Sequence, residues 1–221
     1  MERTLLVVTG LTREARAAAG PGITTLCSGG DSRRLERMLA RTAPQRHLGV
    51  VSFGIAGGLR PDLEPGDLVL GESVVHNDES FAACGNLTAT LRETLSQRDL
   101  RVIEGPMAGV NEVVATPRCK ARLHRESGAI AVDMESHVAA RWAASHGLPF
   151  SIVRVVSDPA HRTLPAVAAN ALKPDGGVDV LRVLRGLAKA PRQLGALAKA
   201  GVDARAAFAA LGRCGVVFAG I

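Results

Sequence analysis

The stretch Val132-Asp133-Met134-Glu135-Ser136 decides how the chain folds around its candidate site. It closes a short apolar run over residues 129–133. The residues after it carry apolar side chains at helical spacing, so we expect a helix over residues 134–146. Glu135 is thereby placed in the first turn of that helix, near the positive end of its dipole.

A second stretch, Val156-Ser157-Asp158, ends the next predicted element. Residues 149–156 are rich in β-branched side chains and nearly continuous in hydrophobicity, as expected of a strand that is covered on both faces, and Pro159 stops it. Asp158 is therefore expected at the carboxyl end of a central strand. Because ligands of open α/β sheets bind at such strand ends, Glu135 and Asp158 together indicate an active site.

Each carboxylate also has a structural interpretation. An acidic residue in a first helical turn complements the helix dipole, and Asp before Pro is a common turn former. Two carboxylates at one edge of the sheet are harder to explain by structure alone.

Periodic segments alternate along the rest of the chain. Strands are predicted over residues 4–9, 22–27, 48–54, 67–76 and 101–108, and helices over residues 12–19, 32–43, 87–97 and 116–126. This alternation favours the α/β class, with a mostly parallel or mixed sheet covered by helices.

Composition divides the chain into two parts. Its 221 residues are 47% hydrophobic and 22% charged, which is ordinary for a globular protein. We expect a core over residues 1–158 and a basic helical extension over residues 159–221, packed on or beside the core. The formal net charge of +6 arises in the extension, since acidic and basic residues balance in the core.

The extension carries a predicted basic amphipathic helix. Val180, Leu181 and Leu184 share one face, and Arg182 and Arg185 lie beside or opposite it; the pattern is repeated after residue 191. Such helices are typical of peripheral contact with a membrane surface. The alternatives are a solvated basic face that caps the core, or an oligomer interface. Nucleic acid is disfavoured as a partner, because 3% aromatic residues and no Tyr leave few platforms for stacking bases.

The sequence predicts a cytoplasmic protein, free or peripheral at the inner face of the membrane. The apolar run at residues 5–8 is too short for a signal peptide, and no stretch is long enough to span a membrane. The four cysteines lie far apart and the six histidines form no ligand pattern. We therefore expect no metal, no disulfide framework and no cofactor.

Four ordered motifs resemble the purine and uridine nucleoside phosphorylase superfamily, which includes methylthioadenosine/S-adenosylhomocysteine nucleosidases. They are Phe53–Leu59, Leu63–Val69, Ala131–Glu135 and Val153–Asp158, and the resemblance covers residues 4–158. It implies a three-layer α/β/α fold with a mixed, partly barrel-like sheet, a homodimer or higher homo-oligomer, and cleavage of the N-glycosidic bond of a purine nucleoside.

A narrower resemblance concerns the hopanoid-associated nucleoside phosphorylases, which are proposed to remove adenine from adenosylhopane. It rests on Ser157–Pro165 and on Leu172–Gly176. It implies phosphorolysis of an adenosyl-lipid in hopanoid biosynthesis. Two alternatives remain open, namely a hydrolytic nucleosidase and a non-catalytic module that binds a nucleoside or a lipid.

The superfamily resemblance assigns roles to three carboxylates. Asp158 protonates or hydrogen-bonds purine N7, Glu135 accepts hydrogen bonds from the ribose hydroxyls, and Glu14 activates water if the reaction is hydrolytic. Further substrate-binding candidates lie in the same motifs or in the loop expected to border the base: Met134, Asp133, Ser157, Gly57, Ile55 and Val113.

A phosphate site is incomplete by the same comparison. Ile55 stands where phosphorylases carry Ser or Thr, and Ser52 stands where many relatives carry arginine. A substitute is the turn Ser28-Gly29-Gly30, whose backbone N–H groups precede a predicted helix, with positive charge supplied by Arg13, Arg33 or Arg34. Inorganic phosphate is then a co-substrate.

Overall fold

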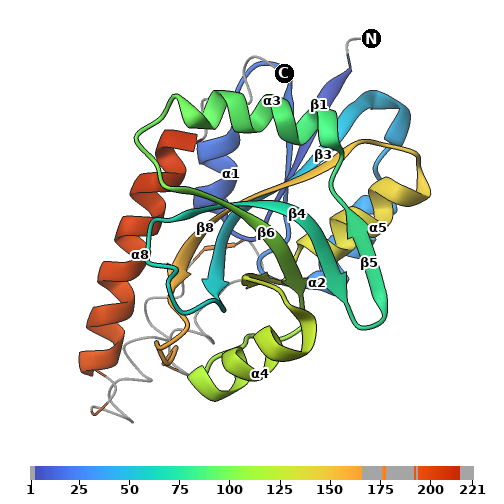
Figure 1. Cartoon of the computed structure of the whole chain (residues 1–221). Coiled ribbons are helices and arrows are strands. Elements are labelled where there is room, and N and C mark those ends of the chain that lie inside the picture. Colours follow the sequence, from blue (N-terminus) through green and yellow to red (C-terminus); the bar gives the residue numbers. More distant parts are fainter. Residues whose placement is uncertain (1–2, 166–175, 178–191, 193, 215–221) are drawn as a thin grey trace.

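The computed structural model describes residues 3–165, 176–177, 192 and 194–214 (Figure 1). Its strands are β1 (Thr4–Thr9), β2 (Ile23–Cys27), β3 (His47–Gly58), β4 (Leu68–His76), β5 (Glu79–Ala82), β6 (Val102–Gly109), β7 (Ala131–Asp133) and β8 (Phe150–Asp158). Its helices are α1 (Thr12–Ala18), α2 (Ser32–Leu39), the 3-10 turn η1 (Pro44–Arg46), α3 (Gly85–Ser96), α4 (Pro117–Ser127), α5 (Ser136–Ser145) and α8 (Leu194–Cys214).

The strands form one mixed sheet that closes on itself. Their order is β2-β1-β3-β7-β6-β4-β5, and β8 pairs with both β3 and β4. The pairing of β8 is parallel to β3 and antiparallel to β4. Strands β3, β7, β6, β4 and β8 therefore enclose a barrel, and β1, β2 and β5 extend it at the edges. The predicted mixed, partly barrel-like sheet is confirmed.

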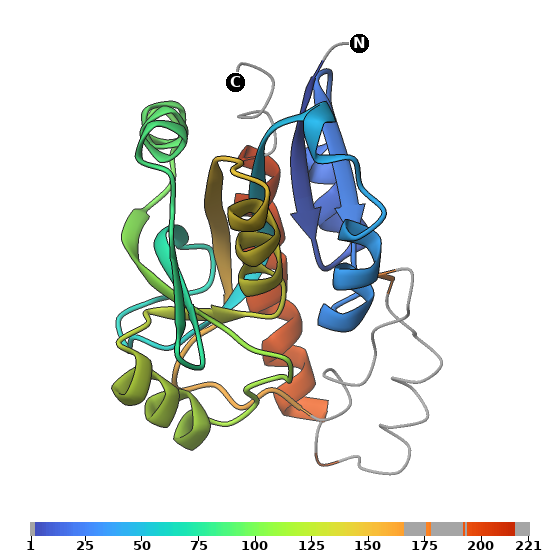
Figure 2. The same cartoon turned by 90° about the vertical axis from the view of Figure 1, so that its right-hand side faces the viewer.

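Helices cover this sheet on two sides (Figures 1 and 2). One hydrophobic cluster joins the strands to α2 and α5, through residues such as Leu35, Leu39 and Val138. A second cluster joins them to α1, α3 and α8, through residues such as Leu91 and Leu211. The two clusters lie on opposite faces of the sheet, so the three-layer α/β/α architecture is confirmed.

Several boundaries differ from the predicted ones. Helix α5 begins at Ser136, so Glu135 is the residue before the helix and not a member of its first turn. Strand β3 continues to Gly58, because its last residues pair with β7 and β8. Strand β5 was missed; it folds back on β4 through a turn in which Asn77 has a φ of 52°.

The extension is described in part. Helix α8 packs against β8 and α1 and buries Ala207, Ala210 and Leu211 in the core. The predicted basic helix around residues 180–189 lies outside the described residues, and the boundary at residue 158 stays a prediction. None of the helices within the described ranges is long and apolar enough to cross a membrane.

Candidate active site

A cavity of about 240 Å³ lies where several strands end. It is bordered by the loop between β1 and α1, the end of β3, the loop after β6, the β7–α5 junction and the end of β8. Its lining residues are Gly10, Leu11, Glu14, Gly30, Ile55, Ala56, Gly57, Val110, Val113, Val114, Val132, Asp133, Met134, Glu135, Ser157, Asp158 and Leu164. The structure thus brings together the three carboxylates to which the superfamily resemblance assigned roles.

Glu14 lies in the first turn of α1 and is 1% exposed. Its Oε2 accepts hydrogen bonds from the backbone N–H groups of Gly10 and Leu11, each at 2.8 Å, and Oε1 accepts one from Ile55 N at 2.8 Å. Burial raises the pKa of Glu14 to about 7, although the Arg154 guanidinium opposes the rise. A carboxyl group with such a pKa can both accept and release a proton near neutral pH.

Two glycines make room for the carboxylates. A Cβ on Gly10 would lie 2.7 Å from Oε1 of Glu135, and a Cβ on Gly54 would lie 2.5 Å from the carboxyl carbon of Glu14. Real Cβ atoms do not approach other atoms so closely. The backbone at these two positions therefore needs glycine for the acidic side chains to lie as they do.

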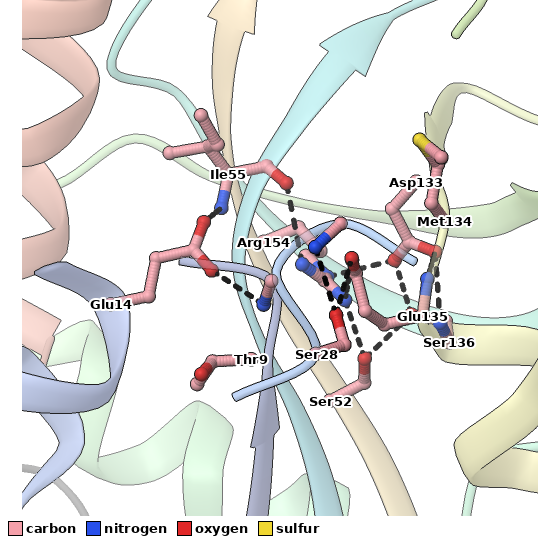
Figure 3. Close-up of polar contacts among 12 residues, drawn as sticks. Thr9, Glu14, Ser28, Ser52, Ile55, Asp133, Met134, Glu135, Ser136 and Arg154 are labelled. Atoms are coloured by element: carbon pink, nitrogen blue, oxygen red, sulfur yellow. Dashed lines mark hydrogen bonds and ion pairs between the residues drawn. The ribbon is translucent and has the colours of Figure 1, made fainter. Parts of the chain in front are cut away.

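Arg154 connects the acidic residues beneath the cavity (Figure 3). It lies in the middle of β8, is 1% exposed, and forms ion pairs with Asp133 at 2.7 Å and with Glu135 at 3.2 Å. Its Nη2 also donates to Ser52 Oγ at 2.6 Å. Because Ser52 stands where many relatives were expected to carry arginine, a guanidinium from the neighbouring strand occupies that region here.

Sequence reasoning missed Arg154, although the sequence held a signal. A charged residue inside a strand that is covered on both faces must be paired, since burying an unpaired charge is very costly. The flanking Val153 and Val155 are fully or almost fully buried, as such a strand requires. The pattern therefore predicts a buried partner for Arg154, but it does not identify that partner.

Glu135 lies between the cavity and Arg154. Its side chain is almost completely buried, and Oε1 accepts a hydrogen bond from Ser28 Oγ at 3.3 Å. Burial raises the pKa of Glu135, while Arg154 opposes the rise and Asp133 adds to it. The contact with Arg154 holds the Glu135 carboxyl group at the surface of the cavity, where its oxygens can accept hydrogen bonds from a ligand.

Asp133 fixes the start of α5. Its Oδ1 accepts hydrogen bonds from the backbone N–H groups of Glu135, at 3.2 Å, and Ser136, at 2.9 Å, and its Oδ2 accepts one from the Ser136 hydroxyl. An acceptor at this position satisfies N–H groups that a helix terminus leaves free. Asp133 lines the cavity, as expected of a substrate-binding candidate, but its contacts also position Glu135.

Asp158 lines the cavity at the end of β8. One extra residue in β8, Ser157, interrupts its pairing with β3, so that Gly57 faces Asp158. Such bulges redirect side chains next to active sites. The Asp158 carboxylate accepts hydrogen bonds from Ser157 Oγ at 2.8 Å and from Lys120 Nζ at 2.5 Å. Burial raises the pKa of Asp158, and the Lys120 ammonium opposes that rise.

The rest of the cavity wall is apolar. Val110, Val113 and Val114 come from the loop after β6, Met134 from the β7–α5 junction and Leu164 from the segment after β8. Leu164 is tied to that loop by a backbone hydrogen bond from its N–H to Ala115 O at 2.8 Å. The expected pocket candidates Val113, Met134, Gly57 and Ile55 all line the cavity.

The structure places some of the candidate phosphate-binding residues at the cavity and others away from its lining. Gly30 lines the cavity, and Ser28 is buried beside Glu135. Arg13 is exposed and stacks its guanidinium over the Phe208 ring of α8, 4.2 Å from the ring centre. Neither Gly29 nor Arg13 is among the lining residues. The placement of Arg13 does not support the predicted role as a source of positive charge for phosphate.

Within the described residues no group of three or more His, Cys, Asp or Glu side chains is arranged to hold a metal ion. The three carboxylates of the cavity are bonded instead to backbone N–H groups, Arg154 and Lys120. This arrangement is suited to proton transfer and to binding hydroxyl groups.

Comparisons with known proteins identify the family of the chain. A profile of the family described as the phosphorylase superfamily matches residues 35–173. The chain is 28% identical over 128 residues to a 5'-methylthioadenosine/S-adenosylhomocysteine nucleosidase of Geobacillus kaustophilus; the match covers 49% of this chain and 54% of that protein. The chain thus spans about half the length of this curated relative.

Solved structures share the fold. One is the 5'-methylthioadenosine/S-adenosylhomocysteine nucleosidase from Neisseria meningitidis in complex with methylthio-immucillin-A, with a TM-score of 0.71, 18% identity, and coverage of 99% of this chain and 100% of that chain. Another is futalosine hydrolase of Helicobacter pylori, with a TM-score of 0.65, 18% identity, and coverage of 91% and 97%. At these identities the likeness concerns the fold.

Proposed function

The chain belongs to the phosphorylase superfamily, and from this premise we propose that it cleaves the N-glycosidic bond of an adenosine-type purine nucleoside, with water as the attacking nucleophile. The observation that carries the proposal is the Glu14 carboxyl group, which lines the cavity with a pKa of about 7. A general base is most effective when its pKa lies near the working pH.

The charge on the cavity surface supports water, and not phosphate, as the attacking nucleophile. Among its lining residues in the described part of the chain, none is Lys or Arg, whereas Glu14, Asp133, Glu135 and Asp158 are acidic. Arg154 lies behind Glu135 and is already paired with carboxylates. An incoming phosphate dianion would be repelled here, whereas the positive charge that develops on the ribose as the bond breaks would be stabilised.

The roles of the three carboxyl groups in this proposal are those that the superfamily resemblance implies, and all three groups line the cavity. Asp158 gives a proton to the departing purine, Glu14 accepts a proton from the attacking water, and Glu135 accepts hydrogen bonds from the ribose hydroxyls. Cleavage of a glycosidic bond by one acid and one base requires two carboxyl groups on different sides of the bond. Met134, next to Glu135, contacts the sugar.

Phosphorolysis is the second candidate. It is favoured by one observation, namely that Gly30 lines the cavity in the turn that precedes α2, beside the buried Ser28. Backbone N–H groups before a helix are suited to bind an anion. The expected adenosyl-lipid substrate is compatible with the apolar wall formed by the valines and Leu164, and it stays a prediction, as do assembly into homo-oligomers and contact with a membrane.

The experiment is adenine release by the purified full chain from adenosine, 5'-methylthioadenosine and an adenosyl-lipid dispersed in detergent. We expect release from at least one of them, and a fall on the order of 100-fold or more with Asp158→Asn, the usual range for loss of a general acid. Asp62→Asn, which removes an exposed carboxylate paired with Arg60, is the control. No release from any of the three by wild type would favour a non-catalytic binding module instead.

A further inference from the structure

Lys120 is a buried lysine on an otherwise exposed or half-buried helix. It lies on α4, is 0% exposed, and is the one residue of that helix that is buried. Its Nζ donates to Asp158 Oδ2 at 2.5 Å, to Asp158 O at 3.1 Å and to Pro159 O at 2.9 Å. An ammonium group has three protons, so these contacts use all of them.

Burying this ion pair costs desolvation free energy, so stability alone does not explain it. Removing an ammonium and a carboxylate from water costs several kcal/mol per ion, so that a well-packed apolar pair is often at least as stable. Lys120 is also absent from the residues that line the cavity. It therefore lies behind Asp158, where it contacts the carboxyl group without reaching a ligand.

We propose that Lys120 is a positioning residue for glycosidic bond cleavage, whose cation stabilises the carboxylate that Asp158 becomes when it gives its proton to the departing base. This inference rests on the proposed function.

The proton balance of the step is simple. As the bond between ribose C1' and the purine nitrogen breaks, its electron pair goes to the base, and the Asp158 proton goes to purine N7. Water adds to C1' and loses a proton to Glu14. Asp158 is left negative next to Lys120, which keeps its proton throughout. Solvent later returns a proton to Asp158 and takes one from Glu14.

Two other groups near Asp158 also affect its protonation equilibrium. Asp203 of α8 disfavours the Asp158 carboxylate, but Arg162 holds Asp203 in an ion pair at 2.7 Å. The Ser157 hydroxyl favours the carboxylate through its hydrogen bond. Among these groups Lys120 is the cation in direct contact with the Asp158 carboxyl group.

A purely structural role predicts different behaviour. Lys120 also ties the chain after β8 to α4 through the two carbonyl oxygens, so its removal could disturb the cavity as a whole. Such damage would lower turnover of every substrate alike. A loss of acid strength at Asp158 would be felt only when the leaving group needs a proton.

The test therefore compares two leaving groups in Lys120→Met and Lys120→Arg. For a purine nucleoside that wild type cleaves, we expect Lys120→Met to lower kcat/KM on the order of 100-fold, as for loss of an effective general acid. For p-nitrophenyl riboside, whose nitrophenolate leaves without a proton, we expect a loss below about tenfold by the same argument. Lys120→Arg keeps the charge and should recover most of the purine activity.

The pH profile gives a second readout. Without the cation, Asp158 holds its proton to higher pH, so the alkaline fall of kcat/KM should move upward in Lys120→Met. Arg101→Met serves as the control, because it removes a salt bridge to Asp67 that does not reach Asp158; it should leave both the ratio of the two substrates and the profile as in wild type. Thermal unfolding verifies that each variant is folded, and Lys120→Gln replaces Lys120→Met if the latter is not.

Equal losses on both substrates, with an unmoved alkaline limb, would overturn the role of Lys120 and leave the nucleosidase intact. If wild type does not accept the nitrophenyl riboside, the position of the alkaline limb decides alone. Inactivity of wild type on every purine nucleoside would instead contradict the proposed function.

Discussion

Nε of Arg154 lies 2.7 Å from Oδ2 of Asp133, and each of the two side chains is 1% exposed. The same guanidinium reaches Glu135, so one buried cation holds the residues on both sides of the β7–α5 junction. The position of the candidate ribose-binding carboxylate thus depends on a residue of β8.

Removing this cation should destabilise the fold strongly. In Arg154→Met, Asp133 and Glu135 lose their partner in a buried site, which costs about 3–5 kcal/mol in comparable cases. Denaturant unfolding measures the change in the free energy of unfolding. Arg92→Met is the matched control, because Arg92 and Glu104 form an exposed pair that should contribute about 0–1 kcal/mol. Equal losses in the two variants would show that Arg154 is not needed to compensate the acidic cluster.

Glu14 should control how activity varies with pH. The proposed base must be ionised to accept a proton from water, and its pKa is raised to about 7. We therefore expect kcat to rise with pH through about 7, and Glu14→Gln to lower kcat on the order of 100-fold or more and to abolish that rise. Glu93→Gln, on an exposed face of α3, is the control. A rise that persists unchanged in Glu14→Gln would assign it to another group.

The same carboxyl group should make stability depend on pH. Its pKa is raised from 4.5 to about 7 on folding, so the folded state binds the proton more tightly. Its stabilising contribution is full below about pH 4.5 and is lost as the pH rises through about 7. Between pH 5 and pH 8 the free energy of unfolding of wild type should fall relative to that of Glu14→Gln by up to about 3 kcal/mol. A difference that does not vary with pH would contradict the raised pKa.

A side chain at Gly10 should displace the Glu135 carboxyl group. In Gly10→Ala the new Cβ would lie 2.7 Å from Oε1 of Glu135, so the carboxylate must move away from its present position. We expect KM for the nucleoside to rise and kcat to fall, together about tenfold to 100-fold in kcat/KM, because small displacements of positioning groups are costly. Gly20→Ala is the control, since nothing lies within 4 Å of a Cβ there. Matching kinetics of the two variants would mean that Glu135 can shift without consequence.

Most of the fold was predictable because it depends on local patterns. The β-branched runs and helical spacing placed most of the elements, and the strand ends placed Glu135 and Asp158 at one cavity. The predicted start of α5 at residue 134 was wrong, because Asp133 accepts the hydrogen bonds of the N–H groups at the start of the helix, which begins at Ser136. Strand β5 was missed because its four residues carry little of the alternation that marks a strand.

The partners of the catalytic candidates were not predictable in the same way. Lys120 resembles any lysine of a surface helix, and only the packing of α4 against the end of β8 buries it. The position of Arg154 in a buried strand predicts a partner but does not identify it, because the partners lie far away in sequence, on β3 and at the β7–α5 junction. Arg13 shows the opposite case. It lies close in sequence to the loop after β1 that borders the cavity, but its guanidinium stacks on the Phe208 ring of α8.

The most direct test of the account is to identify the sugar product while adenine release is followed with and without inorganic phosphate. The account predicts a free reducing sugar, formed at a rate that does not depend on phosphate and that is lost in Glu14→Gln. A sugar 1-phosphate formed only when phosphate is present would contradict the assignment of water as the nucleophile and establish phosphorolysis.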